Sequence, residues 1–396
     1  MTEFTISSFN VKNLIEAEHE YYQFQSYTTE EYSWKEDWLA DQLLTLNADI
    51  VCFQEIFSLQ SLNDVIDETN ARGETSNTDV IPGKDKRYHR RAIFEKLSFD
   101  VYDKKNVFFA PNIHDGEPGN RRPGLAIVSR HGFVGTPEII QVLDEPLKIK
   151  FPELGGGDAG EFVLTRTSRP IIKARIPVGD TVVTVFNTHL KSKLGEYLKP
   201  EGAPFSPEAD LVNYDPVGRA MGSLRATVRR MAEAMVLRKL VVDELDAGNP
   251  VMVLGDYNDG EHAVSSEIIA GEKPFKNYAW MLRHDAEQRN DRYSDEQNIE
   301  IREAIESRAM VSAEKLFVQK SLRDMVYTSA FGGVYESIDQ ILMSRHFLPN
   351  TPHSIGAMEY FSVFNDHLTD GSHPEAPYNK LASDHGQIMA HMKLFN

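Results

Sequence analysis

The sequence contains a single cysteine, Cys52, among 396 residues. One cysteine excludes an intramolecular disulfide, and its position inside the apolar segment 50–53 indicates a small buried side chain rather than a nucleophile. No run approaches about eighteen consecutive apolar residues, so we expect no membrane span, and the first residues show no basic and hydrophobic export signal. We therefore expect a cytoplasmic protein, while secretion without disulfides stays open.

Basic residues are also scarce relative to acidic ones. There are 42 lysines and arginines against 60 aspartates and glutamates, which gives a formal net charge of −18. Such a charge repels polyanions at long range and argues against nucleic acid as a stable partner. A hydrolase needs only a locally positive cleft, so nucleic acid is expected as a substrate instead. No obligate protein partner is evident.

Apolar residues make up 41% of the chain, enough for a sizeable core, and their spacing predicts a β-rich protein with interleaved helices. Short apolar or alternating runs predict strands at residues 4–9, 49–54, 106–110, 124–129, 170–176, 181–188, 250–255, 338–343 and 386–394. Apolar stripes predict core-facing helices over 34–46 and 221–240, and a charged, exposed helix is predicted over 296–320. The second stripe consists of Met221, Leu224, Val228, Met231 and Met235.

Polar residues end six apolar segments that lie far apart in the chain. These segments are Ser8-Phe9-Asn10-Val11, Val51-Cys52-Phe53-Gln54-Glu55, Phe186-Asn187-Thr188-His189, Leu254-Gly255-Asp256-Tyr257-Asn258, Ser337-Ile338-Asp339 and Ser383-Asp384-His385. Strands that stop on polar residues bring distant sequence together at one edge of a sheet. Carboxylates, imidazoles and amides together are what a hydrolase of phosphate esters with a hard metal ion requires. Because the segments straddle every insertion, we read one domain rather than two.

Individually, these residues have plainer explanations. Glu55 fits a metal ligand or a charge at a helix N-terminus equally well, and Asp256 with Asn258 also suits an Asx turn after Gly255. A histidine at a strand end, such as His189, is more often structural, although Lys191 and Lys193 after it suit a loop that faces phosphate. Asp339 is placed to hydrogen-bond the ring of His385 and fix its tautomer.

Taken in order, the six segments resemble the motif series of the endonuclease/exonuclease/phosphatase superfamily, the deoxyribonuclease-I-like enzymes. The resemblance implies an α/β fold, a four-layer α/β/β/α sandwich of two packed mixed sheets flanked by helices. It covers residues 1–396 as one domain, with insertions near 69–91, 190–216 and 260–320. The stretches 155–160 and 195–216 are expected to be surface loops.

The resemblance also implies a role for each site residue. It makes Asn10, Glu55 and Asp384 the metal ligands, for Mg²⁺ with Mn²⁺ as a substitute. It makes the catalytic residues His189, Asp256, Asn258, Asp339 and His385. Asn187, beside His189, is expected to contact the same phosphate. From the residues themselves Arg169 and Lys191 are also expected to contact substrate, although a surface arginine in a turn explains Arg169 nearly as well. Gln340 departs from the family pattern, which often has an aromatic residue or histidine after the aspartate. The general base stays open between Asp256 and the Asp339–His385 pair, as does the number of metal ions.

The function expected from these residues is hydrolysis of phosphodiester bonds by in-line attack of water. A nuclease acting on DNA or RNA is favoured, because we find neither a hydrophobic membrane-docking hairpin nor a basic loop of the inositol phosphatase type. The alternative is a phosphatase or phosphodiesterase acting on a small molecule or lipid headgroup, of the inositol phosphate or sphingomyelin type. A non-catalytic scaffold would require the loss of a core residue, and none is missing. Further cationic candidates are His89-Arg90-Arg91 and Arg121-Arg122, whereas most of the arginines of the helix over 219–240 are expected to be solvated.

Overall fold

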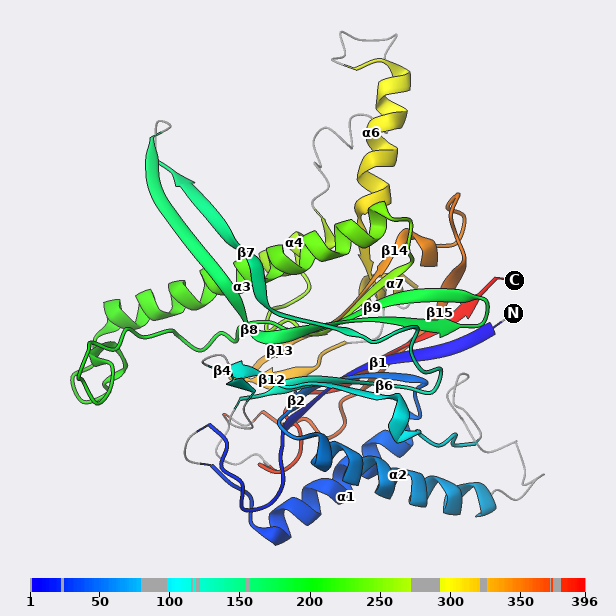
Figure 1. The fold of residues 1–396 in the computed structure, drawn as a ribbon, viewed down its shortest axis with the longest axis horizontal. Helices are drawn as coiled ribbons and strands as arrows, with labels where there is room; N and C mark the ends of the chain where they lie inside the picture. The colour runs from blue at the N-terminus through cyan, green and yellow to red at the C-terminus, as the bar shows by residue number, and fades with distance from the viewer. Residues whose placement is uncertain are drawn as a thin grey trace.

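Two six-stranded mixed sheets form the centre of the computed structural model (Figure 1). The structure describes residues 2–22, 25–79, 98–114, 117–118, 122–153, 157–271, 293–320, 326–370, 372 and 379–395. The first sheet contains β15 (Gly356–Phe364), β16 (Gln387–Leu394), β1 (Thr2–Leu14), β2 (Ile50–Ile56), β6 (Gly124–Ser129) and β3 (Val107–Ala110), in this order. The second contains β11 (Met310–Ser312), β14 (Asp339–Ser344), β10 (Val251–Asp256), β9 (Thr181–His189), β8 (Asp158–Val178) and β7 (Glu138–Pro152), in this order.

The two sheets pack face to face through their alternating apolar side chains. Ile6 and Cys52 of the first sheet lie in one buried cluster with Val185 and Met252 of the second. This alternation is what a strand with one face in the core requires. All nine predicted strands are present, and Cys52 is fully buried as predicted.

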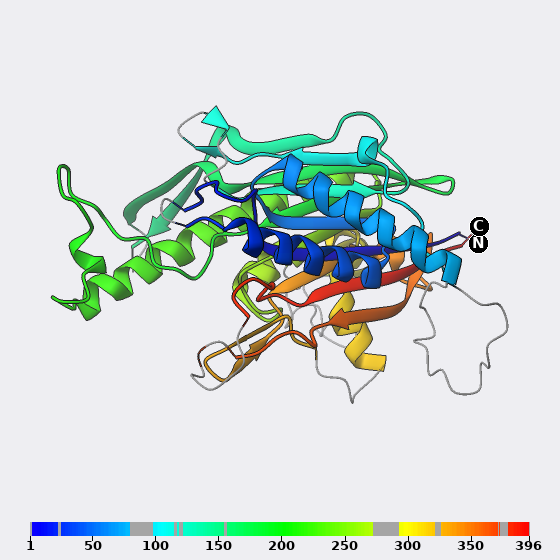
Figure 2. The ribbon, with the colours of Figure 1, turned by 90° about the horizontal axis from the view of Figure 1, so that it is seen from below.

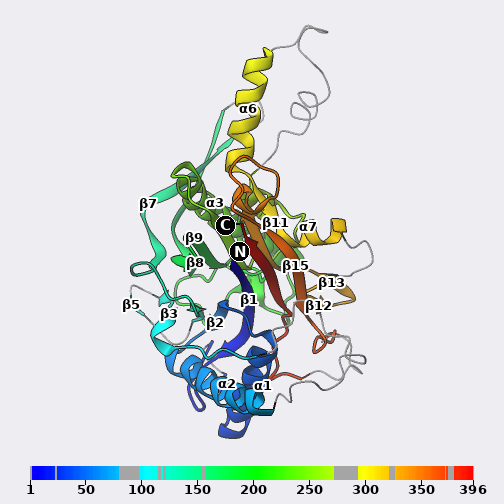
Figure 3. The same ribbon diagram turned by 90° about the vertical axis from the view of Figure 1, so that its right-hand side faces the viewer.

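Helices cover the outer face of each sheet, which completes four layers (Figures 2 and 3). Helices α1 (Thr29–Leu46) and α2 (Leu59–Asp79) pack on the first sheet, where Leu39 and Leu62 join its outward apolar side chains. A capping box between Thr28 and Glu31 begins α1. Helices α3 (Pro216–Asp246) and α4 (Val264–Ala270) cover the second sheet. The layer order expected from the resemblance is therefore confirmed, although α2, β7 and β15 were not predicted.

Smaller elements complete the described structure. They are β4 (Ile113–His114), β5 (Glu117–Pro118), β12 (Ser329–Phe331), β13 (Val334–Glu336), α6 (Asp295–Arg308), α7 (Ala313–Lys320) and 3-10 helices over Lys104–Asn106, Pro207–Ala209 and Arg345–Phe347. Among the described helices, none combines the length and apolar character that crossing a membrane requires. The predicted cationic residues 89–91 and Arg121 lie outside the described residues.

The helix predicted over 296–320 is wrong in its middle. Helix α6 ends at Arg308, the chain becomes extended at Ala309, and β11 pairs with the edge of β14 before α7 begins. Met310 and Ser312 are buried in that strand, so a sheet edge that needs a partner prevails over helix propensity.

The apolar stripe predicted for α3 does not face the core along its whole length. Met221, Leu224 and Met235 are exposed, whereas the buried face of the helix includes Arg230 and Glu233. The first turns of α3 extend beyond the sheet (Figure 1), so their apolar side chains meet no core. Most of the arginines of this helix were expected to be solvated, and Arg230, which is 5% exposed, is an exception.

Gly255 allows β9 and β10 to lie close together at the point where their polar ends emerge. Its φ is 147°, and a Cβ atom there would lie 1.9 Å from the carbonyl oxygen of Thr188. We expect Gly255→Ala to lower the free energy of unfolding by about 3 kcal/mol or more, because both the conformation and the space are denied to alanine. Chemical denaturation measures this. Gly260→Ala is the control, since the nearest atom to its Cβ would be 3.8 Å away, and a loss there as large as at Gly255 would contradict the explanation.

Candidate active site

Strand register places the predicted catalytic residues side by side. In the second sheet Asp256 of β10 pairs with His189 of β9 on one side and with Asp339 of β14 on the other. In the first sheet Asn10 of β1 pairs with Gln54 of β2, the residue before Glu55. His385 lies two residues before the start of β16, the neighbour of β1. Both sheets therefore deliver their polar strand ends to the same edge of the sandwich.

The carboxylate of Asp256 is the centre of this cluster. It is 1% exposed, and its Oδ2 accepts a hydrogen bond from Asn10 Nδ2 at 3.0 Å and from Asn258 Nδ2 at 3.3 Å. The backbone N–H of Asn258 donates to Oδ1 at 2.7 Å. Burial raises the pKa of Asp256 to about 7, against the opposing effect of His385. A carboxyl group with this pKa exchanges a proton near neutral pH.

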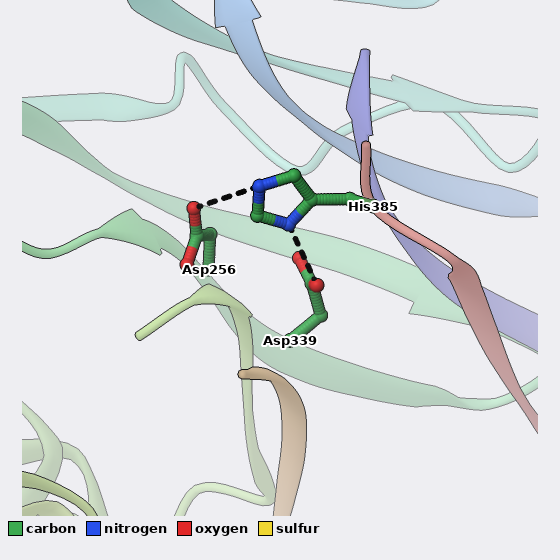
Figure 4. Close-up of side chains that lie close together, drawn as sticks. All are labelled: Asp256, Asp339 and His385. Atoms are coloured by element: carbon green, nitrogen blue, oxygen red, sulfur yellow. Dashed lines mark hydrogen bonds and ion pairs between the residues drawn. The ribbon is translucent and has the colours of Figure 1, made fainter. Parts of the chain in front are cut away.

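His385 lies between two aspartates (Figure 4). Its Nδ1 is 2.9 Å from Asp339 Oδ2, and its Nε2 is 3.8 Å from Asp256 Oδ2. Burial lowers the pKa of His385, but Asp339 and Asp256 more than offset this and hold the pKa well above its ordinary value. The pair of Asp339 and His385 predicted from the sequence is thus formed, with the Nδ1 proton directed at Asp339.

His189 faces the same carboxylate, but its pKa is shifted in the opposite direction to that of His385. Its Nε2 is 3.3 Å from Asp256 Oδ2, and the residue is 3% exposed. Burial, and then the nearby charges of Arg169 and His385, lower the pKa of His189 well below its ordinary value. One histidine is therefore biased toward the cation and the other toward the neutral ring, the kind of division that separates acid and base roles.

Glu55 projects from an irregular end of β2 beside Asn10. Its φ is 65°, a left-handed conformation that is uncommon for a residue with a side chain. Asn10 Nδ2 donates to Glu55 Oε1 at 3.3 Å, and the backbone N–H of Asn13 donates to Oε2 at 3.0 Å. Burial and then Asp384 raise the pKa of Glu55. A divalent cation would remove this cost of ionisation, so the oxygen donors present fit a hard metal ion.

The other predicted metal ligands are placed differently. Asn10 is fully buried at the centre of the cluster, and its Oδ1 accepts from the backbone N–H of Lys12 at 3.0 Å. The side chain of Asp384 is 51% exposed and lies 3.9 Å from Lys12 Nζ. Asp384 is close enough to affect the pKa of Glu55, but it does not line the pocket. A second group that could hold a metal ion consists of Asp256, Asp339 and His385.

A pocket of about 900 Å³ opens over this cluster. Glu55, His189, Asp256, Asn258 and His385 contribute to its lining. Its cationic lining residues are Arg122, Arg166, Arg169, Lys191 and Arg229. Of the acidic lining residues, Glu196 alone lies away from the catalytic cluster. The pocket therefore reverses the sign of the whole protein's charge, as a site for a phosphate ester requires.

Arg169 and Lys191 line the pocket, as predicted, but Asn187 does not. Asn187 is fully buried between the sheets, where its Nδ2 donates to the carbonyl oxygens of Phe53 and Ala126 and its Oδ1 accepts from Gln54 Nε2 at 2.7 Å. Its amide is thus committed to joining the two sheets. This placement corrects the expectation that Asn187 contacts phosphate.

Three further residues act at the site without having been predicted. Tyr22 lines the pocket and interacts with Arg169, and burial raises the pKa of its hydroxyl group. Lys35 is fully buried and donates to the carbonyl oxygens of Val11 and Leu381, both at 3.0 Å. Glu233 of α3 accepts from the backbone N–H groups of two pocket segments. Lys35 and Glu233 could have been noticed as single charges on faces with otherwise apolar spacing, whereas Tyr22 gives no such signal.

Comparisons with known proteins agree with this geometry. The family model described as Endonuclease/Exonuclease/phosphatase family matches residues 8–385. The chain belongs to this family. Its members hydrolyse phosphate esters, and this chain is a phosphoester hydrolase. A search of curated proteins found no match.

Solved structures with a similar fold include Caenorhabditis elegans TDP2, at 12% identity and a TM-score of 0.48, covering 100% of this chain and 98% of the other. The catalytic domain of human nocturnin has 14% identity and a TM-score of 0.42, with 99% and 95% coverage. A mannosyl-6-phosphatase from Bacteroides thetaiotaomicron has 11% identity and a TM-score of 0.44, with 99% and 100% coverage.

The geometry of the cluster predicts which single substitutions lower turnover strongly and which lower it less. We expect His385→Ala and Asp256→Asn each to lower turnover about a hundredfold or more, because each removes a group that is expected to transfer a proton or to position the attacking water. Asp339→Asn is expected to be milder, since the imidazole remains. Steady-state kinetics of folded variants, checked by circular dichroism, measure this. His262→Ala is the matched control, with a side chain 82% exposed. Wild-type turnover in a folded His385→Ala protein would remove His385 from the reaction.

Proposed function

We propose that the protein is a magnesium-dependent phosphodiesterase that cleaves nucleic acid by in-line attack of water on phosphorus. The observation that supports this most strongly is the position of the Asp256, His385 and His189 cluster at a pocket with cationic walls. In a protein with a net charge of −18, such a pocket selects a phosphate group by local charge rather than by a long-range field.

The proposed division of labour follows from the pKa shifts. Asp256, with a pKa of about 7, accepts the proton of the attacking water. His385, whose pKa is held high by its two aspartates, is the cation that faces the phosphate oxygens or the leaving oxygen. His189 stays neutral and donates a hydrogen bond, and Asn258 fixes the carboxylate of Asp256. Arg169 and Lys191 orient the phosphate from the pocket wall.

Glu55 would be the principal magnesium ligand, with Asn10 supporting it. Both lie at the same strand edge as Asp256, and the set offers oxygen donors without cysteine. The ion would neutralise charge on the phosphate when bound.

A lipid headgroup is the second candidate substrate, because the loop beside the pocket is strongly apolar at its surface. Nine large apolar side chains of this loop and of the first turns of α3 are exposed: Leu194, Leu198, Phe205, Leu211, Val212, Tyr214, Val217, Met221 and Leu224. Leu194 also lines the pocket. The sequence was expected to have no hydrophobic membrane-docking hairpin, and these exposed side chains lie in a loop and in the first turns of a helix instead. Such a patch is a common mark of a protein or membrane contact.

An activity screen separates these substrates. We expect cleavage of single-stranded DNA or RNA and of bis(p-nitrophenyl) phosphate, abolished by chelator and restored by Mg²⁺ or Mn²⁺. The second set of substrates in the screen consists of vesicles that contain sphingomyelin or phosphatidylinositol, whose headgroups are phosphodiesters. If the enzyme hydrolysed these lipids but not the nucleic acids, the lipid headgroup would replace nucleic acid as the proposed substrate. Full activity in excess chelator would refute the metal-dependent mechanism.

Metal affinity should rise with pH. The pKa of Asp256 is raised to about 7 and that of Glu55 is raised above its ordinary value, so protons compete with a cation for these carboxylates more strongly at pH 5.5 than at pH 8. We expect Mg²⁺ affinity, measured by calorimetry, to fall by up to about tenfold per pH unit for each displaced proton. Glu314→Gln is the control, because burial also raises the pKa of Glu314 to about 7 but Glu314 lies outside the cluster. A Mg²⁺ affinity that does not change with pH would contradict the assignment.

A further inference from the structure

Strand β8 contains a bulge that presents two arginines to the same pocket. Ile140 of β7 pairs with Ile171 of β8, and Val142 pairs with Arg166, so two steps along β7 correspond to five along β8. Residues three apart on a regular strand point to opposite faces. Because the bulge has three surplus residues, β8 is not a regular strand here, and side chains three residues apart can point to the same side. Arg166 and Arg169 accordingly both line the pocket.

Buried amides hold the bulge from one side. Asn112 Nδ2 donates to the carbonyl oxygen of Ser168 at 3.1 Å and to that of Pro123 at 3.0 Å. Gln141 Nε2 donates to Asn112 Oδ1 at 2.7 Å and to the carbonyl oxygen of Thr167 at 3.4 Å. Asn112 and Gln141 are 4% and 3% exposed, so this network is protected from water and rigid.

Helix α3 holds the bulge from the other side through Glu233, which is 1% exposed. Its Oε1 accepts from the backbone N–H of Ser168 at 2.7 Å, and its Oε2 accepts from that of Lys191 at 2.8 Å. One carboxylate thus ties the bulge to the segment after His189. The cationic wall is therefore fixed in place before any substrate arrives.

The two arginines of the bulge have different surroundings. Arg169 lies beside the catalytic cluster, where it affects the pKa values of Glu55 and His189. Arg166 is not among the main causes of either shift, and within the described part of the chain no acidic partner is found for it. Arg166 is half-buried in the same pocket as Arg122 and Arg229. Arg122 is exposed, and Arg229 Nε lies 2.7 Å from Glu196 Oε1, so Arg166 is the partly buried guanidinium group of the three that best suits phosphate oxygens.

We propose that the pocket contains a second phosphate site, centred on Arg166 with Arg122 and Arg229, which binds another phosphate group of the same substrate molecule. The inference rests on the proposed function and narrows its substrate to molecules that carry a phosphate besides the one attacked. A neighbouring phosphate of a nucleic acid strand and a second phosphate on a small polyol share this chemistry.

Competition against bis(p-nitrophenyl) phosphate hydrolysis tests the site. The probes are thymidine 5′-monophosphate, thymidine 3′-monophosphate and thymidine 3′,5′-bisphosphate, with inositol 1-phosphate and inositol 1,4-bisphosphate as the polyol pair, all at fixed free Mg²⁺. We expect at least one bisphosphate to inhibit about tenfold more strongly than its best monophosphate. Arg166→Gln should reduce that ratio to about threefold or less. Arg175→Gln is the matched control, because Arg175 lies exposed on the same strand outside the pocket and its loss changes the charge equally.

Each outcome of this competition experiment either supports or overturns the second phosphate site. If thymidine 3′,5′-bisphosphate inhibits more strongly than the thymidine monophosphates and this difference depends on Arg166, the site is assigned to a nucleic acid strand. If inositol 1,4-bisphosphate shows the same difference from inositol 1-phosphate, the site is assigned to a small molecule. No advantage in either pair, or an advantage that survives Arg166→Gln, overturns the second site while leaving the proposed function intact. Absence of chelator-sensitive hydrolysis of bis(p-nitrophenyl) phosphate would instead refute the proposed function. In that case direct calorimetric binding of the same probes to wild type and Arg166→Gln still tests the site.

Discussion

The burial of the Asp256 carboxylate is the constraint on which the site depends. A carboxylate that is 1% exposed is costly unless donors surround it. Those donors come from both sheets, since Asn10 belongs to β1 and His189 to β9. Asp256 therefore does more than face the substrate. It fixes how the polar edges of the two sheets meet, and the buried amide of Asn187, which spans the sheets behind it, supports the same alignment.

The surrounding donors offset the cost of burying the Asp256 carboxylate only in part, and the pKa values in the cluster are shifted as a result. The pKa of Asp256 is raised to about 7, that of His385 is raised by its aspartates, and that of His189 is lowered by burial. Three groups within one cluster thus have pKa values that are shifted to different extents and in different directions. A fully neutralised network would be more stable but could not exchange protons with a substrate.

The sequence predicted the strand ends well because two independent signals coincide there, an apolar run that defines the strand and a polar residue that stops it. Predictions failed where a residue's neighbours come from distant sequence. The apolar positions of α3 looked like a core stripe, but the buried face carries Arg230 and Glu233, whose partners lie in other segments. Asn187 lies two residues before His189 on the same face of β9, but it lies deeper between the sheets, where its amide bonds to Phe53, Ala126 and Gln54 of the other sheet. The bulge in β8 depends on pairing with β7, which no local pattern reveals.

This contrast explains why reaction class is easier to predict than substrate. The predicted catalytic residues lie at strand ends that the core between the sheets holds in place, so their spacing in the sequence follows from the fold. The pocket wall stands on a bulge, two loops and one face of α3, held by Glu233 and by the Asn112 and Gln141 amides. Hydrogen bonds rather than apolar periodicity define that wall. A change in the bulge can therefore alter which phosphate ester fits without moving Asp256 or His385, because the wall and the strand ends are supported by different interactions.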